Sequence, residues 1–426
     1  MIDLLVITTL YPNQNQFRHG IFVENRIKSL VGSGRVNAVV VAPVPWFPGI
    51  LLWLWNRLGL TRWLSLEQYQ QYQSIPREEY RSGIRVIHPK YLVIPKIGMY
   101  LTPWFLALSV LMTIVRLRRS GVNWDLVDSH YFYPDGVAVA LISRWLKTPF
   151  CITARGSDIN FIPDYWLARK MIVWAAGKAA INLCVSGDLN KKMISLGMNP
   201  HKVRTVTNGI DETVFSAQSE AERVALRKEL GLSQYSVASV GNLIELKGHY
   251  LLIEAIRSIP DITLLVVGEG EDRQQLEKQV ISLNLKDRVR FLGNLQQSRL
   301  VEIYNAVDLV CLASSREGCA NVLLEAIACG TPVMATDVGG NPETVNSEEI
   351  GQLVPTRTAE AFRQSLEVIK LRHFDRQRIR TLSKRFWYDT INESLLKIYQ
   401  SAFSPENSTE AHGANVHAKK WEASKK

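Results

Sequence analysis

Residues 309–336 read LVCLASSREGCANVLLEAIACGTPVMAT and hold three successive elements. The apolar run at 309–314 predicts a buried strand. A helical pattern follows, and Asn321, a residue type favoured at helix N-caps, marks its expected start. A second apolar run at 332–336 predicts another strand. Because parallel strands need a crossover connection, usually a helix, this segment predicts part of a parallel sheet.

The same alternation extends over almost the whole chain. The further candidate strands are 4–9, 37–42, 126–130, 150–154 and 181–186 in the first half, and 235–241, 262–268 and 289–293 in the second. Amphipathic stretches such as 251–259 and 273–283 lie between them. Short apolar strands separated by helices are typical of parallel sheets covered on both faces. We therefore expect an α/β protein of two Rossmann-like, doubly wound domains with a cleft between them, and ligands at the carboxyl ends of the strands.

Length and composition agree with two globular domains. The chain has 426 residues, of which 46% are hydrophobic and 21% charged, values that exclude a disordered or fibrous protein. Its five cysteines form no CxxC pair, so neither a zinc site nor a redox motif is indicated, and free thiols suit a reducing cytosol. The start of the chain, with Asp3 and no basic leader, resembles a first strand rather than a signal peptide. We expect a cytoplasmic protein.

Charge divides the chain unevenly. Residues 1–207 carry 24 Lys and Arg against 11 Asp and Glu, a balance of +13, and nine of the eleven Trp. This pattern indicates that the first half faces an anionic partner. No nucleic-acid-binding module accompanies it, so we expect an anionic membrane surface and no nucleic acid.

Two segments leave the membrane question open. Residues 97–115 carry no charge and pass the length test for a transmembrane helix, yet Pro103 and several hydroxyl residues also suit a domain helix or an interfacially embedded one. Residues 46–63 interleave four Trp with Leu and also carry Arg57 and Arg62, which suits an interfacial element or a helix packed on the first domain.

The chemistry-bearing residues lie at strand ends. Glu317 follows the strand at 309–314, and Glu325 lies one turn inside the next helix. Two carboxylates so placed can bind two polyol portions of one ligand, while amides at the helix start hold an anion such as diphosphate. The alternative is a solvated Glu325 and an ordinary turn at Gly318.

The surroundings of this pair closely resemble retaining glycosyltransferases with the GT-B fold, in the family-4 group. The matching segments are SREGCANVLLEAIACGTPVMATDVGGNPE (315–343), VGNLIELKGHYLLIEA (240–255), VTNGIDETVF (206–215), ITTLYPNQNQFRHGIFV (7–23), LVDSHYFYPDG (126–136), CITARGSDIN (151–160) and FWYDTINESLLKIYQ (386–400). The resemblance implies an acceptor-side domain at 1–207, a nucleotide-sugar domain at 208–385 and a helix at 386–403 that crosses back. Residues 404–426 lose apolar periodicity, and we expect a disordered tail there.

The resemblance also implies site residues. The catalytic roles fall on His130 and Glu317, and the acceptor side on Arg155 and Asp158. The donor-binding positions are Gly20, Asn242, Lys247, Gly318, Asn321, Val322, Leu323 and Glu325. Because Lys247, glycine-permitted amides and helix N-termini can stabilise departing diphosphate, no metal or other cofactor is expected. We expect His249 to be a surface residue at a helix start.

The resemblance implies a retaining transferase that moves sugar from a nucleotide-sugar to a lipid-linked or polysaccharide acceptor, peripheral to the cytoplasmic face of a membrane. Asn242 stands where the family often has Arg, Cys319 where Phe is frequent, and Gly20 replaces a glycine pair. Two alternatives stay open: a hydrolysing nucleotide-sugar epimerase, and a catalytically silent nucleotide-sugar-binding partner of a membrane assembly complex.

Overall fold

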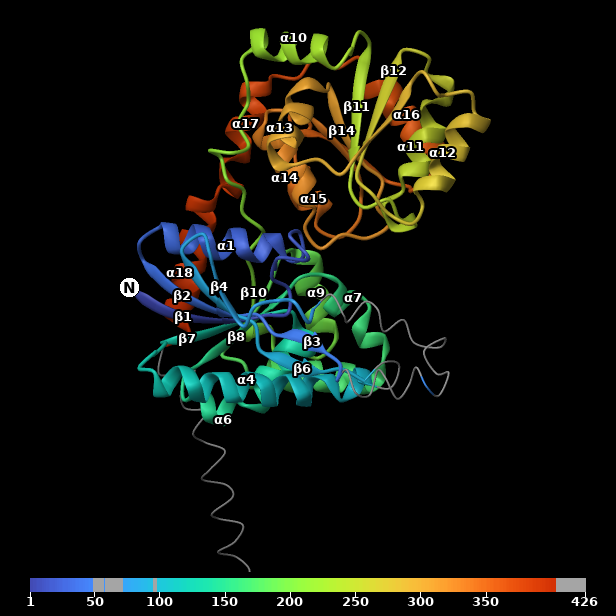
Figure 1. Cartoon of the computed structure of the whole chain (residues 1–426). Helices are drawn as coiled ribbons and strands as arrows, with labels where there is room; N and C mark the ends of the chain where they lie inside the picture. The colour runs from blue at the N-terminus through green and yellow to red at the C-terminus, as the bar shows by residue number, and fades with distance from the viewer. Residues whose placement is uncertain (49–56, 58–71, 95–97, 404–426) are drawn as a thin grey trace, which may run out of the picture. The chain divides into compact units, whose positions relative to one another are not determined.

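The computed structural model describes residues 1–48, 57, 72–94 and 98–403 (Figure 1). The chain divides into two compact units. The first unit contains residues 1–185, 189–206 and 392 onward, and the second contains 186–188 and 207–391. The expected tail at 404–426 and most of the Trp-rich segment 46–63 lie outside the described residues.

The second unit is built on a six-stranded, all-parallel sheet in the order β13-β12-β11-β14-β15-β16. Its strands are β11 (Tyr235–Val240), β12 (Ile262–Val267), β13 (Val289–Gly293), β14 (Leu309–Leu312), β15 (Val333–Thr336) and β16 (Gly351–Val354). The strand order reverses between β11 and β14. In doubly wound sheets, ligands bind outside the carboxyl ends of the strands at such a switch point.

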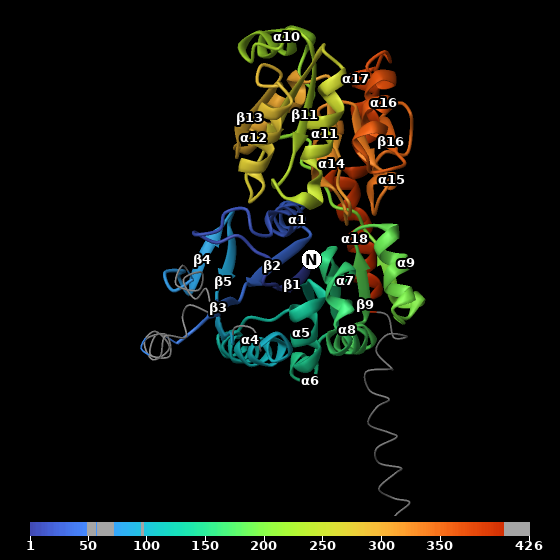
Figure 2. The same ribbon diagram turned by 90° about the vertical axis from the view of Figure 1, so that its right-hand side faces the viewer.

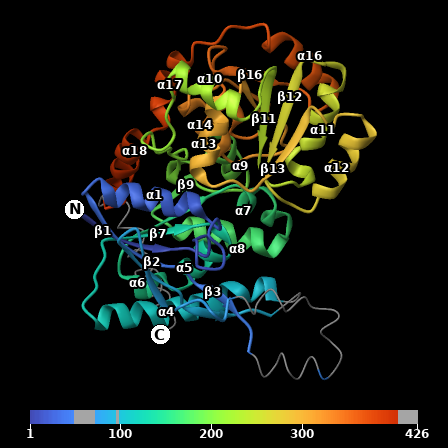
Figure 3. The same ribbon diagram turned by 45° about the horizontal axis from the view of Figure 1, so that its top comes forward.

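Helices cover both faces of this sheet (Figure 3). They are α10 (Glu220–Glu229), α11 (His249–Ala255), α12 (Arg273–Ser282), α13 (Gln297–Ala306), α14 (Asn321–Ala328), α15 (Asn341–Thr344), α16 (Ala359–Ile369) and α17 (Arg376–Ser383). Successive residues of β12 enter opposite cores: Leu265 packs in one cluster with α13 and α14, and Leu264 and Val266 in another with α11, α12 and α16. This double burial explains the continuous apolar runs in the sequence.

The first unit is built on an eight-stranded sheet in the order β10-β9-β8-β7-β1-β2-β5-β4. Its strands are β1 (Ile2–Ile7), β2 (Val36–Val41), β4 (Glu78–Arg81), β5 (Ile84–Ile87), β7 (Leu126–His130), β8 (Phe150–Ala154), β9 (Ile181–Cys184) and β10 (Val203–Thr205). All neighbours are parallel except β4, which pairs antiparallel to β5. A separate ribbon joins β3 (Val44–Trp46) to β6 (Lys90–Leu92).

Helices also cover both faces of the first sheet (Figure 2). They are α1 (Ile21–Gly32), α4 (Thr102–Arg119), α5 (Val137–Leu141), α6 (Ser143–Leu146), α7 (Ser157–Asn160), α8 (Trp166–Lys178) and α9 (Gly187–Ser195), and α18 (Tyr388–Ser401) returns to this unit from residue 392. Asn392 donates to the Ser29 hydroxyl at 2.8 Å, which ties α18 to α1.

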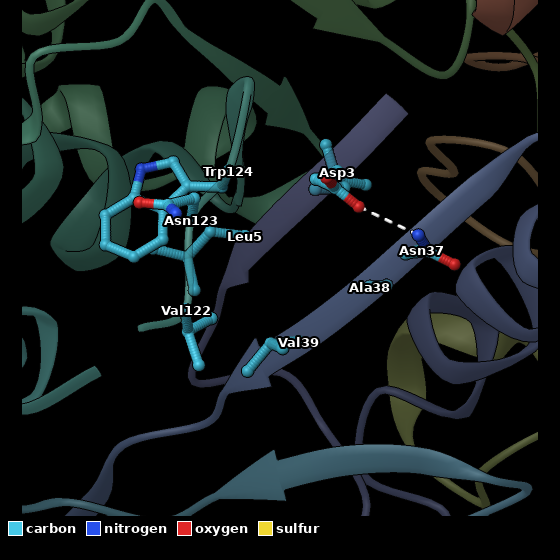
Figure 4. Close-up of a pocket in the computed structure, with 9 residues that line it drawn as sticks. Asp3, Leu5, Asn37, Ala38, Val39, Val122, Asn123 and Trp124 are labelled. Carbon is cyan, nitrogen blue, oxygen red and sulfur yellow. Dashed lines mark hydrogen bonds between the residues drawn. The ribbon is translucent and has the colours of Figure 1, made fainter. Parts of the chain in front are cut away.

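Every strand expected from the sequence is present, with ends that differ by at most two residues, and the two doubly wound sheets confirm the predicted fold class. The ambiguous segment 97–115 contributes most of α4. A hollow of ≈60 Å³ lies beside Asp3, Asn37 and Trp124, where β1 and β2 begin. Figure 4 shows the residues that line it. Because it lies at the amino-terminal edge of the sheet, opposite the ligand edge, it is not part of the candidate site.

Candidate functional site

Lys247 and Glu317 meet at the switch point of the second sheet. Lys247 ends a short turn after β11, and Glu317 lies in the loop after β14. The Lys247 Nζ lies 2.6 Å from Glu317 Oε1, and the Ser314 hydroxyl donates to the same oxygen at 2.6 Å. Both side chains keep some exposure, 20% for Lys247 and 10% for Glu317. A cation and a carboxylate therefore stand together, within reach of a ligand, where the fold places ligands.

Glycines let these loops approach one another backbone to backbone. Gly248 has φ +69°, and a Cβ there would lie 2.2 Å from the Ala313 carbonyl oxygen. Gly339 has φ +55°, and its Cβ would lie 1.9 Å from the carbonyl oxygen of Glu317. Gly340 packs equally closely on the carbonyl of Gly318. No other residue fits these positions without moving the loop that carries Glu317.

Helix α14 begins at Asn321, one residue earlier than an N-cap at that position would place it. Ala320, not Asn321, is its N-cap, and no side chain caps it. The Asn321 side chain instead accepts a hydrogen bond from Asn208 Nδ2 at 2.8 Å. The N–H groups of Asn321 and Val322 lie in the first turn, which offers no intrahelical acceptor.

Leu323 contributes less to this helix start than expected. Its N–H donates to the Ala320 carbonyl at 3.0 Å, and its side chain is fully buried in the core. Asn321 and Val322 thus keep the first-turn N–H groups of α14 that could face an anion, and their role in donor binding stays a prediction.

Glu325 lies one turn inside α14, as expected, but it is not a solvated helix residue. Its Oε2 accepts a 2.7 Å hydrogen bond from the hydroxyl of Tyr304, a fully buried residue of α13. Burial raises the pKa of Glu325 to about 7, although the Tyr304 bond opposes this. Glu325 can thus accept hydrogen bonds from hydroxyls most strongly above neutral pH.

Asn242 lies in the loop between β11 and α11, and His249 is the first residue of α11. Asn242 is exposed, and its carbonyl oxygen lies 3.2 Å from His249 Nε2. The expectation of a surface His249 is wrong, because the ring is 2% exposed and its Nδ1 lies 2.8 Å from the Ser239 hydroxyl. Burial lowers the pKa of His249 to about 4, so the neutral ring fastens the loop to β11.

In the first unit, His130 ends β7 and is completely buried. Its Nδ1 accepts from the Arg155 guanidinium at 2.6 Å, and its Nε2 lies 3.1 Å from Asp128 Oδ2. Burial, reinforced by Arg155 and opposed by Asp128, lowers the pKa of His130 to about 4. The ring is neutral at pH 7 and carries its proton on Nε2. Its predicted catalytic role stays a prediction, since both ring nitrogens face protein groups.

Asp128 belongs to a buried charged cluster. The Tyr399 hydroxyl of α18 donates to Asp128 Oδ2 at 2.5 Å. Burial opposes ionisation of Asp128, but the attraction of His130 and Arg26 holds its pKa below the usual value. Arg26 on α1 is 2% exposed, and its guanidinium nitrogens have no hydrogen-bond partner among the described residues. Nothing in the sequence pattern indicates Tyr399, whose partner Asp128 lies 271 residues away.

The other residues expected in the first unit organise loops. Asp158 is fully buried and its carboxylate accepts from the backbone N–H groups of Phe132, Arg155 and Gly156 at 2.9–3.0 Å. Gly20 has φ +69° directly before α1, and a Cβ there would lie 2.2 Å from the Leu10 carbonyl oxygen. Asp158 thus shapes the loop after β8, and Gly20 opens α1 as expected.

A hollow of ≈180 Å³ lies at the carboxyl edge of the first sheet, in the loops after β1, β2 and β5. Its lining includes Tyr11, Tyr72, Tyr91, Gln16 and His88. Tyr11 is 2% exposed, and its hydroxyl has no hydrogen-bond partner within the described ranges. The sequence pattern gave no sign of this hollow beyond Tyr11, an aromatic residue just after the predicted strand at 4–9.

No group of three or more His, Cys, Asp or Glu side chains that could hold a metal ion occurs among the residues that the structure describes. Metal independence stays a prediction.

Two family models match the chain. "Glycosyl transferases group 1" matches residues 223–384, and "Glycosyltransferase Family 4" matches residues 71–214. A D-inositol 3-phosphate glycosyltransferase of Mycobacteroides abscessus is 33% identical over 68% of this chain and 69% of that protein. TuaC of Bacillus subtilis, named as a teichuronic acid biosynthesis glycosyltransferase, is 28% identical over 86% of this chain and 88% of its own length.

Solved structures share the fold. HepE of Anabaena, solved with UDP, has a TM-score of 0.69 at 20% identity, covering 94% of this chain and 100% of that one. Sucrose-phosphate synthase of Thermosynechococcus elongatus has a TM-score of 0.73 at 19% identity, covering 95% and 99%. These neighbours are GT-B proteins, which confirms the predicted architecture.

Proposed function

Because the chain belongs to the group 1, family 4 glycosyltransferases and is a transferase of the GT-B fold, we propose that it transfers a sugar from a nucleoside-diphosphate donor with retention of anomeric configuration. The proposed acceptor is a lipid-linked or polysaccharide intermediate of cell-surface glycan synthesis. HepE, solved with UDP and with UDP-glucose, supports the donor class, and TuaC, named for teichuronic acid biosynthesis, supports the acceptor class. Family membership disfavours the epimerase, and the presence of Lys247, Glu317 and Glu325 disfavours the silent partner.

The observation that carries this proposal is the Lys247–Glu317 pair at the β11/β14 switch point. Transfer breaks the bond between the anomeric carbon and the diphosphate, so negative charge develops on the leaving group. Lys247 and the first N–H groups of α14 offer positive charge to that group without a metal. Glu317 would orient hydroxyls of the transferred sugar, and Glu325 those of the ribose.

The hollow in the first unit is our candidate for acceptor binding. Tyrosine rings provide apolar faces for a sugar ring, and the unpartnered Tyr11 hydroxyl can bond a sugar hydroxyl. Its ≈180 Å³ is below the ~300 Å³ of a typical drug-sized pocket, so it would accept a single ring rather than a chain.

A panel of nucleotide-sugars tests the proposal. Each compound is assayed for donor hydrolysis and for protection against thermal unfolding. We expect one nucleoside-diphosphate class to raise Tm and to be hydrolysed slowly. Lys247→Ala should abolish both effects. Lys278→Ala, at an exposed lysine of α12, serves as the matched control and should change neither. If no nucleotide-sugar is hydrolysed and none raises Tm, the proposal fails.

A further inference from the structure

Helix α4 has two apolar faces. Its inner face is buried in the first unit through Leu106, Val110 and Ile114. Its outer face exposes Trp104 (56%), Leu108 (57%), Met112 (57%) and Val115 (41%), which are spaced three or four residues apart and so form one stripe. A helix on the surface of a soluble domain normally has a polar outer face. An exposed apolar stripe of this kind indicates a surface that binds another apolar surface.

The neighbouring helices extend the stripe. Arg118 of α4 donates to the Trp145 carbonyl of α6 at 2.7 Å, so Trp145, 53% exposed, lies beside the end of α4. On α8, the exposed Trp166, Lys170 and Trp174 recur every four residues, with the Lys170 Nζ 4.8 Å from the Trp166 ring centroid. Helix α5 contacts both α4 and α8, and Figure 2 shows these helices along one side of the first unit.

Charge on these helices has a single sign. The helices α4, α5, α6 and α8 contain seven basic residues and no Asp or Glu; the basic residues are Arg116, Arg118, Arg119, Arg144, Arg169, Lys170 and Lys178. Exposed Trp beside Arg and Lys, without acidic residues, is the composition of an interfacial membrane-binding surface.

Helix α4 is also fixed in the domain. Ser109 donates to the Lys90 carbonyl of β6 at 2.9 Å, and Arg118 bonds the end of α6. These bonds and the buried inner face hold α4 in the unit, although Gly98–Arg119 is long and apolar enough to span a membrane.

We propose that the outer faces of α4, α6 and α8 form a docking surface for an anionic lipid bilayer, which the protein binds without crossing. The surface lies on elements different from the Trp-rich segment 46–63. The inference rests on the proposed function, because a membrane-embedded, lipid-linked acceptor gives the docking its purpose.

Vesicle co-sedimentation tests the docking surface on the full chain. We expect pelleting with phosphatidylglycerol-containing vesicles at low salt, weak pelleting with phosphatidylcholine alone, and partial release by high salt. The double variant Trp104→Ser/Leu108→Ser should weaken binding by at least about tenfold. Its control, Val224→Ser/Ile281→Ser, removes two equally exposed apolar side chains from the second unit and should bind like the parent protein.

The charge contribution is tested separately. Arg116→Gln/Arg119→Gln should weaken binding at low salt by about tenfold and have little effect at high salt. Lys228→Gln/Lys278→Gln, at exposed lysines of the second unit, is the matched control and should bind like the parent. Pelleting that is unchanged in both docking variants overturns the proposal. So does pelleting that resists alkaline carbonate, which indicates a span, or a shift of the Trp104/Leu108 variant from dimer to monomer in sedimentation velocity, which indicates a second copy as the partner.

Donor hydrolysis, measured on the same variants in the absence of vesicles, separates this proposal from the proposed function. We expect it to be unchanged in all of them. Loss of docking with intact hydrolysis supports the docking surface. Intact vesicle binding in a protein that hydrolyses no nucleotide-sugar would refute the proposed function and leave the surface standing.

Discussion

The carboxyl edges of the two sheets both carry charged and polar side chains, but they differ in how far those side chains are exposed. At the edge of the second sheet, glycines bring backbone against backbone, and Lys247 and Glu317 stay partly exposed. At the edge of the first sheet, Gly20 also brings backbone against backbone, but His130 at the end of β7 is buried between Asp128 and Arg155. Lys247 and Glu317 stay accessible to a ligand because the loops around them contain glycines. The charged cluster around Asp128 is instead part of the core of the first unit.

The largest expected effect is in the sealed cluster. Asp128→Asn should lower the free energy of unfolding of the first unit by about 3–5 kcal/mol, because it leaves the buried Arg26 and Arg155 without the carboxylate beside them. Urea unfolding followed by Trp fluorescence reports this unit, since nine of the eleven Trp lie in residues 1–207. Asp261→Asn, which breaks an exposed pair with Lys370, is the control and should cost about 1 kcal/mol or less. Equal losses in both variants would show that the cluster is not a stabilising core.

Substitutions at the carboxyl edge of the second sheet should lower turnover rather than stability. Glu317→Gln should lower turnover by about 10²–10³-fold, because the neutral amide orients the reacting sugar poorly. The Kd of the free nucleoside diphosphate should stay within a few-fold of the parent value. Steady-state kinetics and calorimetry measure the two quantities. The control is Glu277→Gln on α12, and a Glu317 variant that behaves like this control would remove the proposed role.

Glu325 should make nucleotide binding depend on pH. Its raised pKa, about 7, means that the carboxyl is protonated below neutrality and then accepts hydroxyl donors poorly. Affinity for nucleoside diphosphate should fall by up to about tenfold per pH unit below that pKa. Glu325→Gln should bind nucleoside diphosphate more weakly and without this pH dependence. Titrations of both proteins at several pH values measure the two affinities. Because protonation of the ligand affects both proteins equally, it cancels in the comparison.

The pH dependence of protein stability tests the raised pKa of Glu325 independently. The folded protein keeps the Glu325 proton up to about pH 7, whereas the unfolded chain releases it near 4.5. Stability of the ligand-free protein should therefore decline as pH rises from 4.5 to 7. Unfolding of Glu325→Gln should show a shallower decline, and identical curves for the two proteins would contradict the raised pKa.

The smallest expected effect is that of chelation. If Lys247 and the start of α14 neutralise the diphosphate, excess chelator should leave turnover within a few-fold of the untreated enzyme. Activity that is lost with chelator and restored by a divalent cation would falsify metal independence.

Most strands and helices could be predicted from the sequence, whereas the side-chain contacts between distant segments could not. Strands such as 262–268 were predictable because burial on both faces leaves a continuous apolar run. The sequence pattern missed six strands of only three or four residues, namely β3, β4, β5, β6, β10 and β16. Lys247 and Glu317 could be predicted as neighbours because each follows a strand at the switch point. The contact of Tyr399 with Asp128 could not, because tertiary packing alone brings those residues together.

The return of α18 to the first unit has a consequence for biosynthesis. Leu395 and Tyr399 are fully buried there, and Tyr399 supplies a hydrogen bond to a charge in the core. A ribosome delivers residues 1–206 first, but the core of that unit stays incomplete until residue 399 has left the exit tunnel. The second unit has all its strands by then and can fold ahead of it. We therefore expect the amino-terminal half of the chain to be the last to finish folding.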